Sequence, residues 1–143
     1  DQLRKSVKEE HLDKAVVYDF LHGQDFQDAL NISDVFLVSL FDGLTGLAVP
    51  SKTYSYMMAG KPVIAIMGVH SDISKDLIEN KAGFAMEVGE VDKLVNSITK
   101  LKKDKKLRIE MGSNIRRVFE EKYTTEKATL KYVEMIKEAL EEK

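Results

Sequence analysis

Short apolar runs of strand length alternate with helical patterns along the first 90 residues, and this alternation constrains the fold more than any other feature. Residues 34–40 (DVFLVSL) and 62–67 (PVIAIM) are almost continuously apolar. Strands have this pattern when helices cover both faces of a parallel sheet. Residues 15–21 (AVVYDFL) and 83–88 (GFAMEV) are also predicted strands. The sequence therefore predicts an α/β fold with helices on both faces of a parallel sheet.

The expected helices lie between and after these strands. One passes through Phe26, Ala29 and Leu30, one starts at Pro50 and ends at Gly60, and a third, over 72–80, is capped by Ser71. Three more follow residue 90, each with an apolar face at helical spacing. Those faces are Leu94, Val95, Ile98 and Leu101, then Leu107, Met111, Ile115 and Val118, then Thr129, Val133, Ile136 and Leu140.

Composition removes several classes of function. The 143 residues suit one modest domain, and a net charge of −2 argues against a nucleic-acid-binding protein. There is no cysteine, the three histidines are isolated, and no metal site is expected. No apolar run approaches the ~18 residues of a membrane span. The first residues already resemble the inside of a helix, through Leu3 and Val7, without an initiator Met. This pattern predicts a fragment of a longer protein.

Ligands of such sheets bind beyond the carboxyl ends of the strands. The loops expected there cover 21–24, 41–50, 67–71 and 88–90, and the most informative segment is 43–52 (GLTGLAVPSK). It leads from a buried strand to a helix start that carries Pro50, Ser51 and Lys52, where amides, a hydroxyl and an ammonium would suit a phosphate or diphosphate. It matches neither GxxxxGK[ST] nor GxGxxG, and such helix starts more often bind structural water.

Other residues have one functional and one ordinary interpretation. Ser55 could bond a ribose or sugar hydroxyl, or bond back to the Ser51 carbonyl. Ser71 and Asp72 could contact a ligand, although an ordinary cap with an acidic first turn is favoured. His22 could face a nucleobase or solvent. Tyr54, Tyr56, Met57 and Met58 are expected in the core, and the lysines at 102–103 and 105–106 are expected to be solvated.

The segment 46–68 (GLAVPSKTYSYMMAGKPVIAIMG) resembles the nucleotide-sugar-binding core of glycosyltransferase family 4, in the C-terminal domain of GT-B enzymes. It is most similar to a bacterial subgroup with the pattern G-L-x-V-P-S-K-x-Y, which includes enzymes of exopolysaccharide, capsule and lipopolysaccharide synthesis. The likeness continues through 16–20, 33–36, 71–84 and 107–123 (LRIEMGSNIRRVFEEKY). The resemblance implies a Rossmann-like fold and a single donor-binding domain over 1–143. Its sheet and crossover helices would occupy about 1–89, and its C-terminal helices about 90–143.

The resemblance also implies an activity, the retaining transfer of a sugar from a nucleotide diphosphate to a polysaccharide or lipid-linked acceptor. The full-length protein would be a hexosyltransferase that uses a UDP-sugar and needs no metal or other cofactor. Lys52 would neutralise charge on the leaving group. The diphosphate would contact Val49, Pro50, Ser51 and Lys52. The ribose or sugar would contact Gly46, Leu47, Ser55, Gly68, Ser71 and Asp72, and the base would lie near Phe20, Leu21 and His22.

The chain departs from the family pattern at two places. Many members carry two glutamates eight residues apart, at the positions that Leu47 and Ser55 occupy here. The resemblance implies that the N-terminal domain of a GT-B enzyme, which completes the acceptor cleft, is not part of this sequence, and the first strand or strands of this domain are expected to be missing as well. The fragment alone is therefore expected to be inactive. The resemblance implies a cytoplasmic protein, with a peripheral position at the inner membrane face open for the full-length enzyme.

Two other functions use the same architecture. A non-catalytic nucleotide-binding or regulatory module, such as a receiver domain, would need an acidic pair and a later lysine that Asp42 and Lys61 do not supply. A sugar-nucleotide epimerase half-domain would need more acid–base residues than these loops contain.

Overall fold

The computed structural model describes residues 2–41, 43–44 and 47–141, and the chain forms two compact units, Asp1–Asn31 and Ile32–Lys143. The first unit contains α1 (Gln2–Glu9) and nearly all of α2 (Gly23–Ile32). The Arg4 guanidinium donates to the Asp19 carboxylate at 2.6 Å, which fixes the connecting chain against α1. Both helices agree with the helices predicted at these positions.

The strand predicted over 15–21 does not form. This segment is irregular, and Val16, Tyr18 and Phe20 are 69%, 70% and 78% exposed. Its β-branched and aromatic residues favour an extended backbone, but a strand also needs a neighbour that pairs its backbone groups and covers its side chains. The described sheet supplies no such neighbour to this segment.

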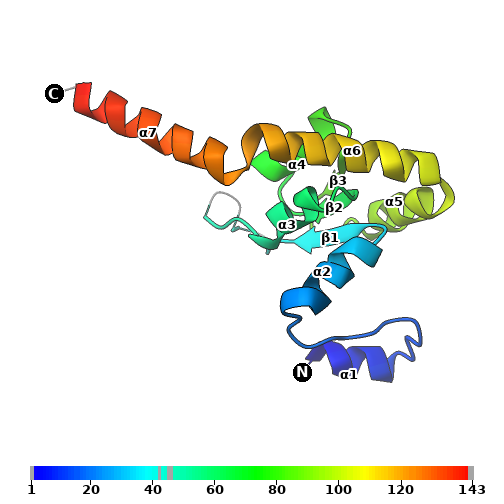
Figure 1. Cartoon of the computed structure of the whole chain (residues 1–143). Coiled ribbons are helices and arrows are strands. Elements are labelled where there is room, and N and C mark those ends of the chain that lie inside the picture. The colour runs from blue at the N-terminus through cyan, green and yellow to red at the C-terminus, as the bar shows by residue number, and fades with distance from the viewer. Residues whose placement is uncertain (1, 42, 45–46, 142–143) are drawn as a thin grey trace. The chain divides into compact units, whose positions relative to one another are not determined.

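The second unit is built on a parallel sheet, shown in Figure 1. Within the described residues the sheet has three strands in the order β1-β2-β3, namely Phe36–Ser39, Val63–Ile66 and Gly83–Met86. The helices are α3 (Lys52–Met58), α4 (Asp72–Glu79), α5 (Val91–Lys103), α6 (Lys105–Lys122) and α7 (Thr125–Glu141). The α/β class, the parallel strands and the alternating helices are therefore confirmed.

The core forms where the sheet meets α5 and α6. Ile64, Met86, Leu101 and Met111 make one buried cluster, and Leu107 packs against it. This confirms the apolar face predicted for α6, which also buries Ile115 and Val118 completely. On α5 the predicted face is buried mainly at Leu101, and Val95 and Ile98 are about half exposed.

The last helix, α7, has no buried residue. Its predicted apolar face, with Val133, Ile136 and Leu140, is exposed along its length. Figure 1 shows α7 extending from the end of α6. Among the described helices, none is both long and apolar enough to cross a membrane.

Helices α3 and α6 cross at two glycines. Gly60, just after α3, has a φ of 65°, and a Cβ added to Gly112 would lie 2.2 Å from the Gly60 carbonyl oxygen. The Arg116 guanidinium also donates to the Met58 carbonyl at this crossing. Backbone therefore packs directly on backbone, which holds α6 at a fixed distance from α3.

Candidate functional site

A cavity of about 360 Å³ opens at the carboxyl ends of β1 and β2. Leu40, which follows β1, and Met67, which follows β2, line its floor. The walls come from the loop before α3, the start of α4 and two tyrosines. The other lining residues are Leu47, Ala48, Val49, Pro50, Tyr54, His70, Ser71, Asp72, Ile73 and Tyr123. Two of the loops predicted to hold a ligand, 41–50 and 67–71, therefore border one cavity.

Of the four residues predicted to bind a diphosphate, two lie in the cavity wall and two lie at the start of α3. Val49 and Pro50 line the cavity, whereas Ser51 and Lys52 are exposed and are not among the described lining residues. Helix α3 begins at Lys52, two residues later than predicted. The chain already turns at Pro50, because its carbonyl accepts the Thr53 N–H at 2.9 Å. Lys52 thus lies two residues after Pro50, which lines the cavity.

The residues predicted to contact a ribose or sugar fall into three groups, according to whether they line the cavity, lie outside its described lining, or lie outside the described residues. Leu47, Ser71 and Asp72 line the cavity. Ser55 and Gly68 are partly buried and are not among its described lining residues. Gly46 lies outside the described residues, so its predicted contact stays a prediction.

The start of α4 has the predicted cap. The Ser71 hydroxyl accepts the Ser74 N–H at 3.2 Å and donates to the Ser74 hydroxyl at 2.9 Å. The favoured interpretation of Ser71 as an ordinary cap is therefore confirmed. Asp72 is exposed in the first helical turn and lines the cavity, where its carboxylate could accept a hydroxyl.

Two tyrosines complete the cavity, and the sequence did not predict either of them as a site residue. Tyr54 of α3 was expected in the core, but it is only partly buried and lines the cavity. Its ring lies 5.1 Å from the Tyr123 ring, at the end of α6. Met57 is fully buried as predicted, and Tyr56 is partly buried and stacks on Phe36 with ring centroids 4.2 Å apart. Met58 is 38% exposed, so its predicted core position is wrong. His70 also lines the cavity and was not predicted to do so.

A buried carboxylate holds Tyr123 in place. Asp76 of α4 is 4% exposed, and it accepts the Tyr123 hydroxyl at 2.5 Å. The same carboxylate forms an ion pair with the Lys122 ammonium, which is partly exposed. Because Asp76 lies on α4 and its two partners lie at the end of α6, this cluster fixes one wall of the cavity.

Both cavity tyrosines are held in their neutral form. Burial, and then the hydrogen bond to Asp76, raises the pKa of Tyr123 above its ordinary value. Burial, and then the charge of Asp72, raises the pKa of Tyr54. Both hydroxyls therefore remain protonated at neutral pH, which suits hydrogen bonding to a ligand better than proton transfer.

The residues predicted to lie near a base belong to the first unit. The Phe20 and His22 rings stack with centroids 5.4 Å apart, and Leu21 is partly buried. Their contact with a nucleobase stays a prediction.

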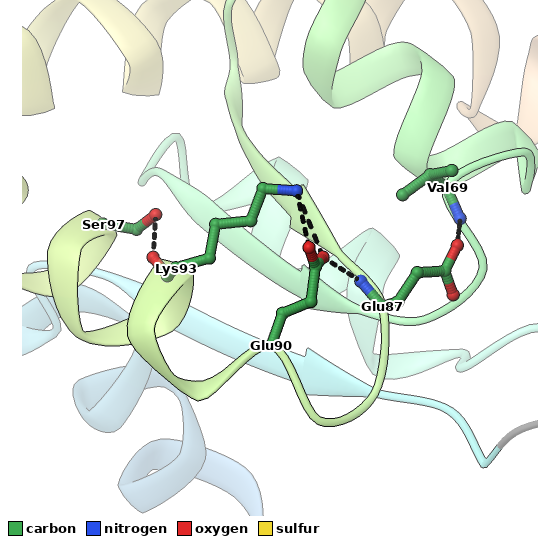
Figure 2. A network of polar contacts seen from close by, with 5 residues as sticks. All are labelled: Val69, Glu87, Glu90, Lys93 and Ser97. Atoms are coloured by element: carbon green, nitrogen blue, oxygen red, sulfur yellow. Dashed lines mark hydrogen bonds and ion pairs between the residues drawn. The ribbon is translucent and has the colours of Figure 1, made fainter.

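A polar network joins the loops that follow β2 and β3 (Figure 2). The Val69 N–H donates to the Glu87 carboxylate at 2.9 Å, and the Glu87 N–H donates to Glu90 at 2.8 Å. The Lys93 ammonium contacts both Glu90 oxygens at 3.1 and 3.2 Å. The predicted loops 67–71 and 88–90 are therefore connected at the same edge of the sheet.

The Glu90 carboxylate is expected to titrate below the ordinary range of glutamate. The Glu87 N–H, and then Lys93, lower the pKa of Glu90. A carboxyl with a depressed pKa stabilises the fold above its unfolded pKa, and this contribution is lost as pH falls through the folded pKa. Lys93→Ala should raise the pKa of Glu90 in part, measured by NMR titration of its side-chain carbon. Lys102→Ala is the control, and a complete return to the ordinary pKa would contradict the main role of the Glu87 N–H.

Comparison with known proteins gives two results. The family model described as "Glycosyl transferases group 1" matches residues 1–118. The protein named "Probable glycosyltransferase WbjE" from Pseudomonas aeruginosa is 33% identical over 84 residues, which are 59% of this chain and 21% of that protein. The chain thus aligns with about a fifth of that relative's length. With most of its residues covered by the family model, the chain belongs to the glycosyl transferases group 1 family.

Proposed function

We propose that the chain is the donor-binding part of a retaining glycosyltransferase of the GT-B type in family 4. The observation that carries this proposal is the cavity beyond β1 and β2, which is lined by Val49, Pro50, Ser71 and Asp72 among others. It occupies the edge at which open α/β sheets bind nucleotides. Its volume of about 360 Å³ lies within the usual range of small-molecule sites.

In this proposal a nucleotide-diphosphate sugar, with UDP as the first candidate, binds along the start of α3. The backbone of 49–51 approaches the diphosphate, and Lys52 neutralises the charge that develops on the leaving group as the bond from the anomeric carbon breaks. Asp72, together with the hydroxyls of Tyr54 and Tyr123, supplies hydrogen bonds to the rest of the donor. No side-chain proton transfer is assigned to this part of the enzyme, and no metal is needed in this scheme.

The acceptor would be a polysaccharide or a lipid-linked sugar of a bacterial cell-surface pathway, brought to the donor by a part of the enzyme outside this chain. The whole enzyme would act in the cytoplasm or at the inner face of the membrane. The chain alone should bind donor weakly and show no transfer when it is mixed with a UDP-sugar and an acceptor. Turnover by the chain alone, measured as release of UDP, would contradict this assignment of roles.

Substitution of Lys52 tests the donor site. Lys52→Ala should weaken the binding of UDP or GDP by roughly 10- to 100-fold, because a charge-assisted contact to the diphosphate is lost. Calorimetry measures the affinity for UDP, GDP and inorganic phosphate.

Lys103→Ala is the matched control for this experiment, because Lys103 is also exposed and lies at the end of α5. Equal weakening in the two variants would show a general effect of charge. Unchanged binding in Lys52→Ala would refute the proposed role of Lys52.

A further inference from the structure

A second cavity, of about 430 Å³, lies between the first turns of α7, the end of α6 and α3. Its lining residues are Tyr54, Lys122, Tyr123, Ala128, Lys131, Tyr132 and Met135. Tyr54 and Tyr123 also line the first cavity, so the two cavities share a wall. The proposed donor site does not use the remaining residues.

One face of α7 supplies most of this second cavity. Ala128, Lys131, Tyr132 and Met135 follow the spacing i, i+3, i+4 and i+7, which places them on one side of a helix. Met135 and Tyr132 are each more than half exposed, so a ligand could reach them.

The ionised side chains that line this cavity are both cationic, because the described lining residues include two lysines and no carboxylate. Lys122 is paired with Asp76 and also feels the charges of Glu79 and Glu121, although its side chain remains 43% exposed. The cationic character of the cavity therefore rests mainly on Lys131. Among the described residues, no carboxylate lies within ion-pair distance of the Lys131 ammonium. The glutamates of α7, such as Glu134 and Glu138, do not line the cavity.

We propose that this second cavity binds a small organic phosphate. The phosphate group would lie against Lys131 and Lys122, and an apolar or ring-shaped body would pack on Tyr132 and Met135. Tyrosine faces and a methionine thioether accept flat or apolar groups, and the lysines attract the anion. The cavity volume fits one small molecule. This proposal does not rest on the proposed donor site, although the two cavities share Tyr54 and Tyr123.

Phenyl phosphate is a suitable probe, because it joins one anion to one ring. It is titrated into the ¹⁵N-labelled chain, and the amides of Ala128, Lys131 and Met135 are followed by NMR, because these residues line the second cavity and not the first. Inorganic phosphate and benzyl alcohol are titrated in parallel. We expect phenyl phosphate to shift these amides at lower concentration than either fragment. Equal effects of phenyl phosphate and inorganic phosphate, or shifts confined to the first cavity, would overturn the proposal.

Variants of α7 separate specific binding from general attraction. Lys131→Gln and Tyr132→Ala should each weaken phenyl phosphate binding by roughly fivefold or more. Lys137→Gln, an exposed lysine of the same helix outside the cavity, should leave binding unchanged. Circular dichroism confirms that each variant keeps its helix content. Unchanged binding in both cavity variants, or the same loss in Lys137→Gln, would overturn the proposal.

Discussion

Gly112→Ala is expected to lower the free energy of unfolding by about 3 kcal/mol, as overpacking of a tight contact does. The new Cβ would lie 2.2 Å from the Gly60 carbonyl oxygen, so α6 would have to move away from α3. Helix propensity alone predicts the opposite sign, because alanine is more favourable than glycine in a helix by about 1 kcal/mol. Chemical denaturation measures the change directly.

Ser113→Ala is the matched control, because Ser113 is the next residue of α6 and is exposed. This change should alter stability by less than about 0.5 kcal/mol. If Gly112→Ala were as stable as the parent chain, the contact between α3 and α6 would not be as close as described.

Asp76→Ala is expected to lower the free energy of unfolding by about 2 to 4 kcal/mol. The substitution removes the acceptor of the Tyr123 hydroxyl and the partner of Lys122. The Tyr123 hydroxyl, partly buried, would lose its bond, and α4 would lose its polar connection to the end of α6. Thermal and chemical denaturation measure the loss.

Two further variants show which contacts of Asp76 account for the loss of stability. Tyr123→Phe should cost about 1 kcal/mol, the usual contribution of one hydrogen bond. Glu79→Ala, which removes an exposed carboxylate on the same helix, should have little effect. A loss of stability in Glu79→Ala equal to that in Asp76→Ala would contradict the special role of Asp76.

The Tyr123 contact should also depend on pH. Because the folded pKa of Tyr123 is raised, the contribution of its hydroxyl to the free energy of unfolding is complete below about pH 10, the ordinary tyrosine pKa, and is lost as pH rises above that value.

The sequence predicted the strands whose runs are apolar at nearly every position, namely the runs that became β1 and β2. Burial on both faces holds for β2, whereas β1 alternates between buried and exposed residues and leaves Leu37 47% exposed. Residues 15–21 have a similar β propensity but form no strand. A strand also needs a neighbouring strand to pair with, and the β propensity of a segment does not indicate whether such a neighbour exists. The start of α3 differed by two residues, because the turn at Pro50 has i to i+3 bonds before the helix begins.

The sequence predicted the parts of the candidate site whose position follows from the order of strands and loops along the chain. It did not predict the parts that depend on how distant helices pack together. The loops after β1 and β2 must lie at one edge of a parallel sheet, so Val49 and Asp72 were predicted near each other. Tyr123 follows α6, a helix that begins 47 residues after α3 ends, and its hydrogen bond to Asp76 holds it at the cavity. An aspartate within an amphipathic helix has the same local pattern whether its carboxylate is solvated or buried, so the sequence carried no signal for this cluster.

The shared wall formed by Tyr54 and Tyr123 has a thermodynamic consequence. A molecule on one side that reorients these rings changes the affinity for a molecule on the other side whenever that second molecule also contacts the rings, and linkage then requires the same factor in both directions. The hydrogen bond from the Tyr123 hydroxyl to Asp76 opposes such a reorientation.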